Sequence, residues 1–442
     1  MFFTTQNNQK QDVPMKRIIK QLLNVKNVKV LGARTETEQN GDKTVVFKVE
    51  PTKGQRCRCP VCGKKVKFYD KGKGPRRWRA LDFAAARVYI ESESPRVKCR
   101  EHGVLAAKVP WARQHSTFTR DFEDTVAWMG RHLCRSAVAE YMRVAWNTVG
   151  PIISRCKKDA DPNPGHRFDG LKRIGIDETS YKKGHKYITV IVNHDTNSVI
   201  WAHEKHGKEV LKLFLEELTP EQRASIECYS ADGARWISET MGEYCPKAER
   251  CLDSFHLVEW ANESLDKVRA ESWQNARKKE EERGRGSPKK GEGKDRAAKT
   301  IKGSMYALGK APENLTEGQK AKLDYIANTD KRLYRAYCLK ESLRTLIKLS
   351  PDEIAENLKG WLWKASHSRI PAIYELQKKI RRHVEAIKNT AKHHLSNARI
   401  EATNNKIKLS IRMAYGFRNI GNMLDLIMLR CSDIPIFLPG RA

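Results

Sequence analysis

The sequence predicts an α/β protein of several domains. A small β domain that binds a metal ion comes first, short helices follow, and a mixed α/β region is joined to a long helical segment. Three observations lead to this fold class. The chain has 442 residues, more than one hydrophobic core usually organises. Cysteine pairs with short spacers gather near the N-terminus. Strand-like alternation and the helical period then follow one another between residues 171 and 253.

The composition favours a polyanionic binding partner. The chain carries 84 Lys and Arg residues against 53 Asp and Glu residues, a formal net charge of +31. Because neutralised phosphates release counterions, this excess predicts binding to double-stranded DNA; a merely soluble basic surface is the alternative. No apolar run approaches the roughly 18 residues of a membrane helix, and the N-terminus lacks a secretory signal. We therefore expect no membrane association and a cytoplasmic protein, associated with the nucleoid when it is bound to DNA.

Residues 1–112 are predicted to form a β domain that holds one structural Zn²⁺ ion. Two pairs of potential ligands, each with a two-residue spacer, occur there: Cys59 with Cys62, and Cys99 with His102. This is the spacing of zinc knuckles, and four protein ligands leave no position for a reactive water. Cys57 competes as a ligand. The alternative for the whole set is a group of unrelated reduced cysteines.

A basic cluster with one aromatic residue lies between the two knuckles, at Arg76, Arg77, Trp78 and Arg79. Such a cluster suits contacts to phosphates and to a base, so the three arginines are predicted to bind DNA. A solvated edge strand with a single buried Trp is an equally good interpretation.

Residues 113–165 change to the helical period. Short helices joined by a turn of a few residues predict a helix-turn-helix-like DNA-binding domain. Asn147 is expected to cap the third helix and to contact DNA. The run Asp161-Pro-Asn-Pro-Gly165 marks the end of this domain.

Residues 166–256 are predicted to form a mixed α/β domain. Alternation and period place strands and helices in this order: strands over 171–177, 187–193 and 199–203, a helix over 207–218, a strand ending at 232, a helix over 235–244 and a strand over 248–253. Residues 257–396 are mostly helical in pattern and include a mobile, charged loop over 278–299. Residues 397–442 are predicted to form helices that complete the α/β domain.

Three acids in different settings are candidates for a catalytic metal site. Asp177 and Asp232 each end a predicted strand, and Glu401 lies on a predicted helix. Carboxylates from separate segments are the ligands with which two Mg²⁺ ions, or Mn²⁺ in their place, promote phosphoryl transfer. Each acid also has an ordinary interpretation, since acids are common in turns and at the first turn of a helix.

A further acid and a histidine follow the last predicted strand. Asp253 is an alternative to Asp232 as the second metal ligand, and the choice stays open. His256 is expected to have an accessory role in positioning DNA or a water, although a lone His more often caps a helix or packs in a core.

The predicted helix of Glu401 also carries Asn404, Lys408 and Arg412, which helical spacing places near the same face. An acid, an amide and two bases together suit a metal beside a DNA backbone, so these three residues are predicted to bind DNA. A solvated helix face is the alternative.

Together these segments resemble the transposases of ISL3-type insertion sequences. Beside the knuckles, the resemblance rests on these strings: Ile176-Asp177-Glu178, Ala231-Asp232-Gly233, Asp253-Ser-Phe-His256 and Ala414-Tyr-Gly-Phe-Arg418. It implies an RNase H-like DDE catalytic core, formed by 166–256 and 397–442 and interrupted by a helical insertion over 257–396. It also implies that the N-terminal domains recognise terminal inverted repeats. We expect a homodimer or larger assembly on the repeats and the target DNA.

The predicted function is therefore that of a Mg²⁺-dependent DNA transposase that cuts and joins strands. Two alternatives stay open: an RNase H-like nuclease or resolvase that cuts without joining, and a non-catalytic zinc-finger regulator. The three acids argue against the regulator, whereas no feature of the sequence separates the transposase from the nuclease.

Overall fold

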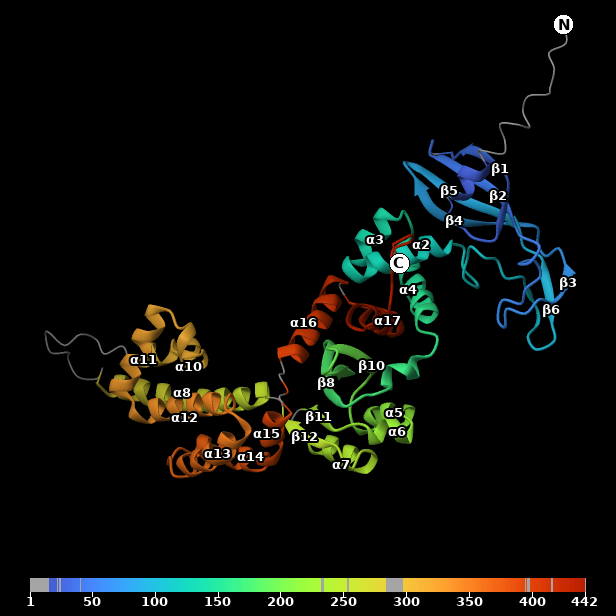
Figure 1. Ribbon diagram of the computed structural model, residues 1–442. Coiled ribbons are helices and arrows are strands. Elements are labelled where there is room, and N and C mark those ends of the chain that lie inside the picture. The colour runs from blue at the N-terminus through green and yellow to red at the C-terminus, as the bar shows by residue number, and fades with distance from the viewer. Residues whose placement is uncertain are drawn as a thin grey trace, which may run out of the picture. The chain divides into compact units, whose positions relative to one another are not determined.

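The computed structural model describes residues 16–21, 23, 25–39, 41–231, 234–252, 254–283, 297–393, 395, 398–414 and 416–441. The side chains at 254, 255, 283 and 398–401 lie outside this description. The chain forms two compact units, one of Met1–Pro162 with Ser410–Ala442 and one of Asn163–Leu409. Figure 1 labels the elements of both units.

Two β-sheets open the first unit. The larger sheet has the strand order β1 (Val28–Thr37), β2 (Lys43–Pro51), β5 (Ala86–Glu93) and β4 (Pro75–Phe83). Its central strands β2 and β5 are parallel, and its outer pairs are antiparallel. The smaller antiparallel sheet has the order β3 (Lys67–Asp70), β6 (Arg96–Cys99) and β7 (Gly103–Ala106). Trp78 and Trp111 pack edge to face in the core of this region, with ring centroids 5.4 Å apart.

Helices from both ends of the chain complete the first unit. These are α2 (Arg120–His132), α3 (Arg135–Tyr141), α4 (Trp146–Ala160) and α17 (Ile420–Cys431). Asp425 of α17 accepts hydrogen bonds from Ser154 and from Lys157 of α4, whose Nζ is 2.8 Å away. The buried Arg430 donates to the carbonyl of Gly130 at 3.1 Å. These contacts attach the C-terminal helix to the N-terminal helices.

The structure therefore groups residues 410–442 with the N-terminal unit. This differs from the prediction that all of 397–442 completes the α/β domain. The reason is physical, because the polar groups of α17 find their partners on α2 and α4, far away in the sequence.

The second unit contains a five-stranded mixed sheet. Its strands lie in the order β10 (Ser198–Glu204), β9 (Lys186–Asn193), β8 (Arg173–Lys182), β11 (Cys228–Ala231) and β12 (Glu249–Leu252). The first three form an antiparallel meander, whereas β11 runs parallel to both β8 and β12. The 3-10 turn η1 (Pro164–Phe168) leads into the sheet.

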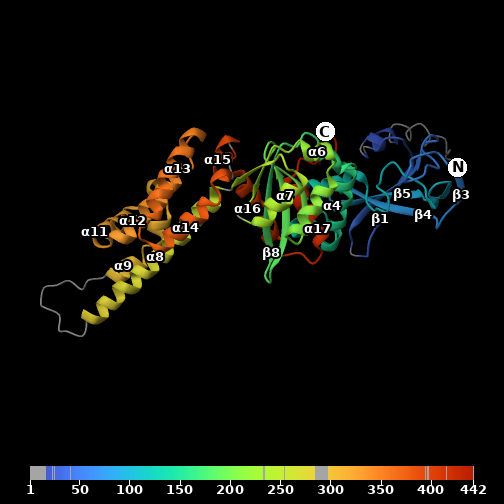
Figure 2. The same ribbon diagram turned by 90° about the horizontal axis from the view of Figure 1, so that it is seen from below.

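One face of this sheet is covered by α5 (Lys208–Glu217) and α7 (Arg235–Tyr244), with the short α6 (Pro220–Ala224) beside them (Figure 1), and Figure 2 shows α7 in front of the strands. Leu211, Phe214 and Met241 of these helices are buried against Ile174 and Tyr229 of the sheet. Because side chains alternate along a strand, Tyr229 and Ala231 belong to this face, and Cys228 and Ser230 belong to the other.

The order of these strands and helices agrees with the prediction, except that the short α6 was not predicted. One difference affects the site. The strand that carries Asp177 continues to Lys182, because β8 and β9 extend together as a hairpin. Asp177 therefore lies inside a strand and not at its end.

The rest of the second unit is helical, with a large core of aliphatic and Trp side chains. Its elements are α8 (Ser254–Arg283), α9 (Ala297–Lys302), α10 (Met305–Gly309), η2 (Pro312–Asn314), α11 (Glu317–Thr329), α12 (Lys331–Leu346), α13 (Pro351–Ser366), α14 (Pro371–Arg381) and α15 (Val384–Lys392), followed by α16 (Ala398–Met413), which runs into the first unit.

The charged loop predicted over 278–299 is helical at both ends. Residues 278–283 belong to α8 and residues 297–299 belong to α9, whereas 284–296 lie outside the described residues. Lys, Glu and Arg are good helix formers, and Arg277 and Glu281 form an i,i+4 ion pair of 3.1 Å on α8. None of the described helices has the length together with the apolar content that a membrane span requires.

Candidate functional site

The two predicted zinc knuckles come together in the first unit. The ligand atoms of Cys59, Cys62, Cys99 and His102 all lie within 4.8 Å of one another. The Sγ atoms of Cys62 and Cys99 are 3.9 Å apart, and Cys59 Sγ is 3.8 Å from His102 Nδ1. A tetrahedral zinc with bonds of about 2.0–2.3 Å keeps its ligand atoms about 3.5–3.8 Å apart. The four side chains therefore fit one structural Zn²⁺ ion.

Tight turns present these ligands. Gly63 and Gly103 each follow the second ligand of a knuckle and have φ of 69° and 71°, a conformation that glycine adopts without strain. The amide of Gly63 donates to the carbonyl of Cys59 at 3.0 Å and closes the first turn. Cys57 is not a member of the four-residue group that the described residues form. A hydrogen bond with His102 lowers the pKa of the Cys99 thiol, which favours the thiolate that binds zinc.

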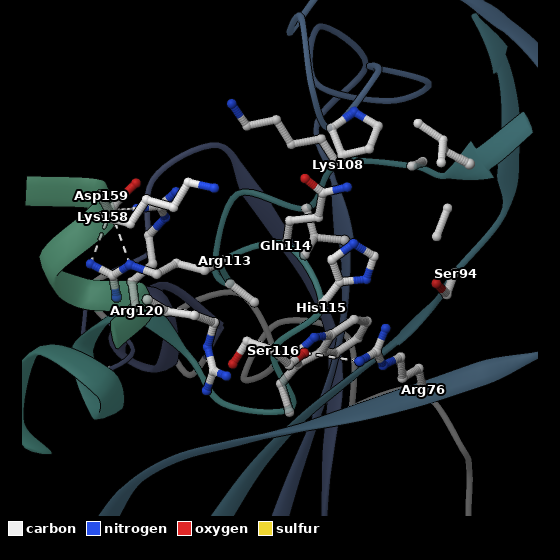
Figure 3. A pocket seen from close by; sticks show the side chains of 18 residues that line it. Arg76, Ser94, Lys108, Arg113, Gln114, His115, Ser116, Arg120, Lys158 and Asp159 are labelled. Atoms are coloured by element: carbon white, nitrogen blue, oxygen red, sulfur yellow. Dashed lines mark hydrogen bonds and ion pairs between the residues drawn. The ribbon is translucent and has the colours of Figure 1, made fainter. Parts of the chain in front are cut away.

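A basic cavity lies between the sheets and the helices of the first unit (Figure 3). Its volume is about 560 Å³. Beside the acid Asp159, its lining contains these basic side chains: Arg76, Lys108, Arg113, His115, Arg120, Arg155 and Lys158.

Ion pairs neutralise part of this charge. Arg113 and Arg120 contact Asp159 at 3.0 and 2.7 Å. In contrast, Lys108 and Lys158 are exposed and form no ion pair within the part of the chain that the structure describes. The cavity therefore keeps a positive charge that suits a phosphate.

Arg76 is the one predicted arginine that lines this cavity. Its guanidinium lies 5.3 Å from the ring centre of Trp78, and its Nη2 donates to the carbonyl of Ser116 at 2.9 Å (Figure 3). These contacts hold the cation at the cavity wall and leave other N–H groups for a ligand.

Arg77 and Arg79 have different environments. Arg77 binds Glu36 at 2.9 Å and Glu91 at 3.0 Å. Arg79 is only 6% exposed and pairs with Asp82. Both guanidinium groups are thus engaged within the protein, and their predicted contact with DNA remains a prediction.

Asn147 lies in the first turn of α4, and its side chain is exposed. The prediction that Asn147 caps this helix is wrong, because α4 begins at Trp146 and Ala145 is the cap residue. Trp146 is 42% exposed, and the guanidinium of Arg135 lies 4.5 Å from the centre of its ring. The N-terminal turn of α4 therefore presents an aromatic ring and an amide to solvent.

Asp177 is half-buried on β8, opposite Val190 of β9. The hydroxyl of Thr179 donates to its Oδ2 at 3.0 Å. Among the described residues, no Lys or Arg forms an ion pair with this carboxylate. Its oxygens are therefore available to a cation.

The strand register brings the ends of two further strands to this part of the sheet. β11 ends at Ala231, after its Ser230 has paired with Gly175 of β8. β12 ends at Leu252, the partner of Ala231. In the sequence, these strands are followed directly by Asp232 and Asp253.

The other predicted acids cannot be placed by side-chain geometry. Asp232 and Asp253 lie outside the described residues, and so does the side chain of Glu401, which belongs to α16. The structure therefore brings together the neighbouring strand ends, and the carboxylate set itself remains a prediction.

His256 and the three predicted DNA-binding residues of α16 lie among the described residues. His256 lies in the first turn of α8, with its Nδ1 3.0 Å from the carboxylate of Glu259. Along α16, Asn404, Lys408 and Arg412 recur every four residues; Lys408 and Arg412 are exposed, and Asn404 is half-buried. Their predicted contacts with DNA remain predictions.

Three family models match successive parts of the chain. A zinc-finger model of the transposases of IS204, IS1001, IS1096 and IS1165 matches residues 55–102. A model of the helix-turn-helix domain of transposase family ISL3 matches residues 107–156. A transposase model of the same family matches residues 174–427, more than half of the chain. The chain belongs to the ISL3 family of transposases.

Relatives of this ISL3 transposase match it over nearly its full length. It is 44% identical over 434 residues to the transposase of insertion sequence element IS1557 in two strains of Mycobacterium tuberculosis, CDC 1551 / Oshkosh and ATCC 25618 / H37Rv; the match covers 96% of this chain and 97% of the relative. It is 24% identical over 390 residues to the transposase of IS1001 from Bordetella parapertussis, with 87% and 91% covered.

Sequence reasoning missed the cavity residues Lys108, His115 and Lys158 of this ISL3 transposase. They come from three separate segments that meet only after folding. The overall positive charge was the one available signal, and it does not identify individual lysines.

Proposed function

We propose that this chain is a DDE transposase that binds the terminal inverted repeats of its insertion sequence and catalyses DNA strand cleavage and strand transfer. One observation carries the proposal: β11 is the neighbour of the Asp177 strand β8, β12 is the neighbour of β11, and each of these two parallel strands is followed in the sequence by an aspartate. Membership of the ISL3 family supports it, and the relatives are transposases of insertion sequence elements.

We assign the five-stranded sheet to the RNase H-like class. The support is its topology, in which an antiparallel meander is extended by two parallel strands on the side of β8. The helices α8 to α15 then form an insertion between β12 and α16. Such an arrangement allows a helix from after the insertion to add its acid to those of the strands.

Asp177, Asp232 and Glu401 would hold two Mg²⁺ ions, with Asp253 as the alternative to Asp232. The chemistry of the donors fits, since Mg²⁺ prefers carboxylate oxygens and Asp177 has no Lys or Arg partner among the described residues. When bound, such ions activate the attacking oxygen and stabilise the leaving one. Mn²⁺ takes the same ligands and should substitute.

The residues around Asp177 prepare its carboxylate for this role. Thr179 donates to one oxygen and limits rotation of the side chain. The hairpin of β8 and β9 fixes the backbone on one side, and β11 fixes it on the other. Asn404, Lys408 and Arg412 on the helix of Glu401 are proposed to hold the DNA backbone near the acids.

The first unit is proposed to recognise the DNA ends. Asn147 would contact base edges, because it lies in the first turn of α4 and the first turn of the second helix of a helix-turn-helix enters the major groove. Arg76, Lys108 and Lys158 of the basic cavity would contact phosphates, which position the protein without reading the sequence. Arg77 and Arg79 would have to leave their acid partners to take part.

Transposition requires two ends to be held together. We therefore propose that a homodimer or larger assembly acts on the paired ends and the target DNA, at the nucleoid.

The test is a cleavage assay on a supercoiled donor plasmid that carries the inverted repeats, with Mg²⁺ or Mn²⁺, run beside a gel shift on one end. The wild-type protein should cut and join strands. Asp177→Asn and Glu401→Gln should bind the end normally without cutting it. The control Glu239→Gln, on the exposed face of α7, should bind the end and cut it as the wild type does. Comparison of Asp232→Asn with Asp253→Asn identifies the second ligand.

Three outcomes decide between the functions. Cleavage without joined products would replace the proposal by a nuclease or resolvase. Specific binding without any cleavage by the wild-type protein would favour a regulator. Strong cleavage by Glu401→Gln would eliminate the proposed carboxylate set.

A further inference from the structure

A second group of metal-ligand side chains lies in the second unit, far along the chain from the zinc knuckles. The ligand atoms of Cys228, Cys251 and His393 lie within 4.8 Å of one another. Cys228 begins β11, Cys251 belongs to β12, and His393 directly follows α15. Both thiols are completely buried, whereas 15% of the His393 side chain is exposed. No short motif in the sequence connects these three residues.

The strand register explains why the two thiols face each other. β11 and β12 are parallel, with Ser230 opposite Cys251. Cys228 precedes Ser230 by two residues, so both point to the same face of the sheet. This is the face opposite α5 and α7, and the two cysteines share it with the buried Leu395.

A carboxylate fixes the orientation of the histidine. The Nε2 atom of His393 is 2.6 Å from Glu249 of β12, and the same carboxylate binds Lys392 at 2.7 Å. When Nε2–H donates to Glu249, Nδ1 keeps the free lone pair. This is the usual arrangement of a histidine that binds a metal, since a carboxylate on the distal nitrogen sets the tautomer and raises the basicity of the other.

The end of α15 is bound to β12 at several points. Thr390 accepts from the amide of Leu252 and donates to its carbonyl, both at 2.9 Å. Asn389 donates to the carbonyl of Arg250 at 3.1 Å. The segment that carries His393 is therefore held against the strand that carries Cys251.

We propose that Cys228, Cys251 and His393 bind a second Zn²⁺ ion, separate from the ion of the zinc knuckles. Two sulfurs and one imidazole are ligands that zinc prefers. Binding would release the two thiol protons to solvent, and the resulting pair of thiolates balances the charge of the ion. The buried site is then neutral, which removes most of the cost of burying a charge. A water would supply the fourth ligand from the side where His393 is exposed.

The geometry requires little adjustment. Tetrahedral zinc separates sulfur and nitrogen ligands by about 3.5–3.8 Å, so the limit of 4.8 Å leaves at most about 1.0–1.3 Å of contraction. The knuckle ligands meet the same limit, with individual separations of 3.8 and 3.9 Å.

The ion would connect the segments that lead to the proposed acids. Cys228 lies four residues before Asp232, Cys251 two residues before Asp253, and His393 eight residues before Glu401. This consequence rests on the proposed function, because it assigns the ion the task of holding those three segments together. The zinc content of the protein does not rest on it.

The first measurement is the metal content of the untagged, full-length protein, purified with reductant and dialysed against metal-free buffer. Elemental analysis and native mass spectrometry should find about two zinc ions per chain. Cys62→Ser should lose one ion, and Cys228→Ala with Cys251→Ala should lose the other. The matched control is Cys245→Ala. Cys245 is a buried cysteine of the same unit that belongs to neither ligand group, and burial raises the pKa of its thiol to about 11.

A wild-type protein with one zinc ion, all of it lost in Cys62→Ser, would overturn the proposal. So would a disulfide between Cys228 and Cys251 in the reduced preparation. Because the alanine variants risk misfolding, cobalt substitution of Cys62→Ser provides a second measurement with the cluster intact: thiolate-to-cobalt absorption in the near ultraviolet is expected, and its absence contradicts the site. Failure of strand cleavage in the plasmid assay leaves these readings unchanged, so the two proposals fail separately.

Discussion

The zinc knuckles and the proposed carboxylate site are built in opposite ways. The knuckle ligands all lie between residues 59 and 102, as two pairs with two-residue spacers, and glycine turns set their geometry. Asp177 and Glu401 are 224 residues apart, and the whole helical region separates them. A site made of local turns is thus visible in the sequence itself. A site made of distant segments is encoded only through the fold.

The largest effect is expected from breaking the local site. Cys62→Ser removes one ligand of a structural zinc, and such ions contribute about 10–16 kcal/mol of apparent binding energy in small zinc domains. We expect loss of one zinc ion per chain, unfolding of the knuckle region in limited proteolysis, and loss of binding to the DNA end. The control is Cys338→Ser, at an exposed cysteine of α12. Full zinc retention by a Cys59→Ser/Cys62→Ser protein would rule this site out.

Breaking the long-range site should abolish chemistry and leave the fold intact. Asp177→Asn and Glu401→Gln keep the shape of the side chain and remove its charge. We expect cleavage to fall by at least about 10³-fold, equivalent to about 4 kcal/mol of transition-state stabilisation. DNA affinity in the gel shift should change less than about twofold, because no cationic contact is lost. A large loss of DNA affinity with little loss of cleavage would instead assign these acids to DNA binding.

The first unit also contains a long-range ion cluster, formed by Arg34, Arg77 and Glu91. Hydrogen bonds from Arg34 and Arg77 lower the pKa of Glu91 from 4.5 to about 2. The lowered pKa means that this carboxylate stabilises the fold above about pH 4.5, and that the contribution is lost as the pH falls from 4.5 towards 2. At pH 7, Glu91→Gln should destabilise the first unit by about 1–3 kcal/mol.

Thermal unfolding at several pH values measures this effect. The wild-type protein should lose stability on acidification more steeply than Glu91→Gln. Glu93→Gln, at an exposed position on the same strand, should behave as the wild type. Parallel pH profiles for wild type and Glu91→Gln would show that the cluster contributes nothing.

The smallest effect is expected from a single cavity lysine. Lys158→Ala removes one phosphate contact, so the slope of log affinity against log salt should become shallower by about 0.9. Fluorescence anisotropy on the DNA end from low to physiological salt measures the slope. Lys359→Ala, at an exposed position on α13 of the second unit, is the control and should leave it unchanged. An affinity of the wild-type protein that is nearly independent of salt would point to another partner.

Prediction from the sequence worked where the signal was local. Spacing identified the four knuckle ligands, and the alternation of apolar residues identified the strands of the five-stranded sheet. It failed at Asn147, which was predicted to cap α4. The helix already begins at Trp146, so Asn147 lies inside its first turn. It treated Arg76, Arg77 and Arg79 alike, although Arg77 is exposed, whereas Arg79 is buried and pairs with Asp82. The cluster of Cys228, Cys251 and His393 was not predicted, because these residues lie far apart in the sequence and form no motif of short spacing.

The strand of Asp177 shows a further limit. Its pattern indicated a strand that ends at the acid, but cross-strand pairing with β9 extends it to Lys182. Pairing is a property of two segments, so the sequence of one segment does not fix its length. Likewise, nothing in α17 indicates that its partners are α2 and α4.

The packing of α17 on α4 has a consequence for how the protein is made. Asp425 accepts hydrogen bonds from Ser154 and Lys157, so the first unit is complete only after α17, which ends at Cys431, has been translated. We expect products of premature stop codons or frameshifts in the second unit to be poor competitors for the DNA ends. Nearly every molecule that occupies an end would then also carry Asp177 and Glu401. A gene organised in this way produces few dominant-negative fragments.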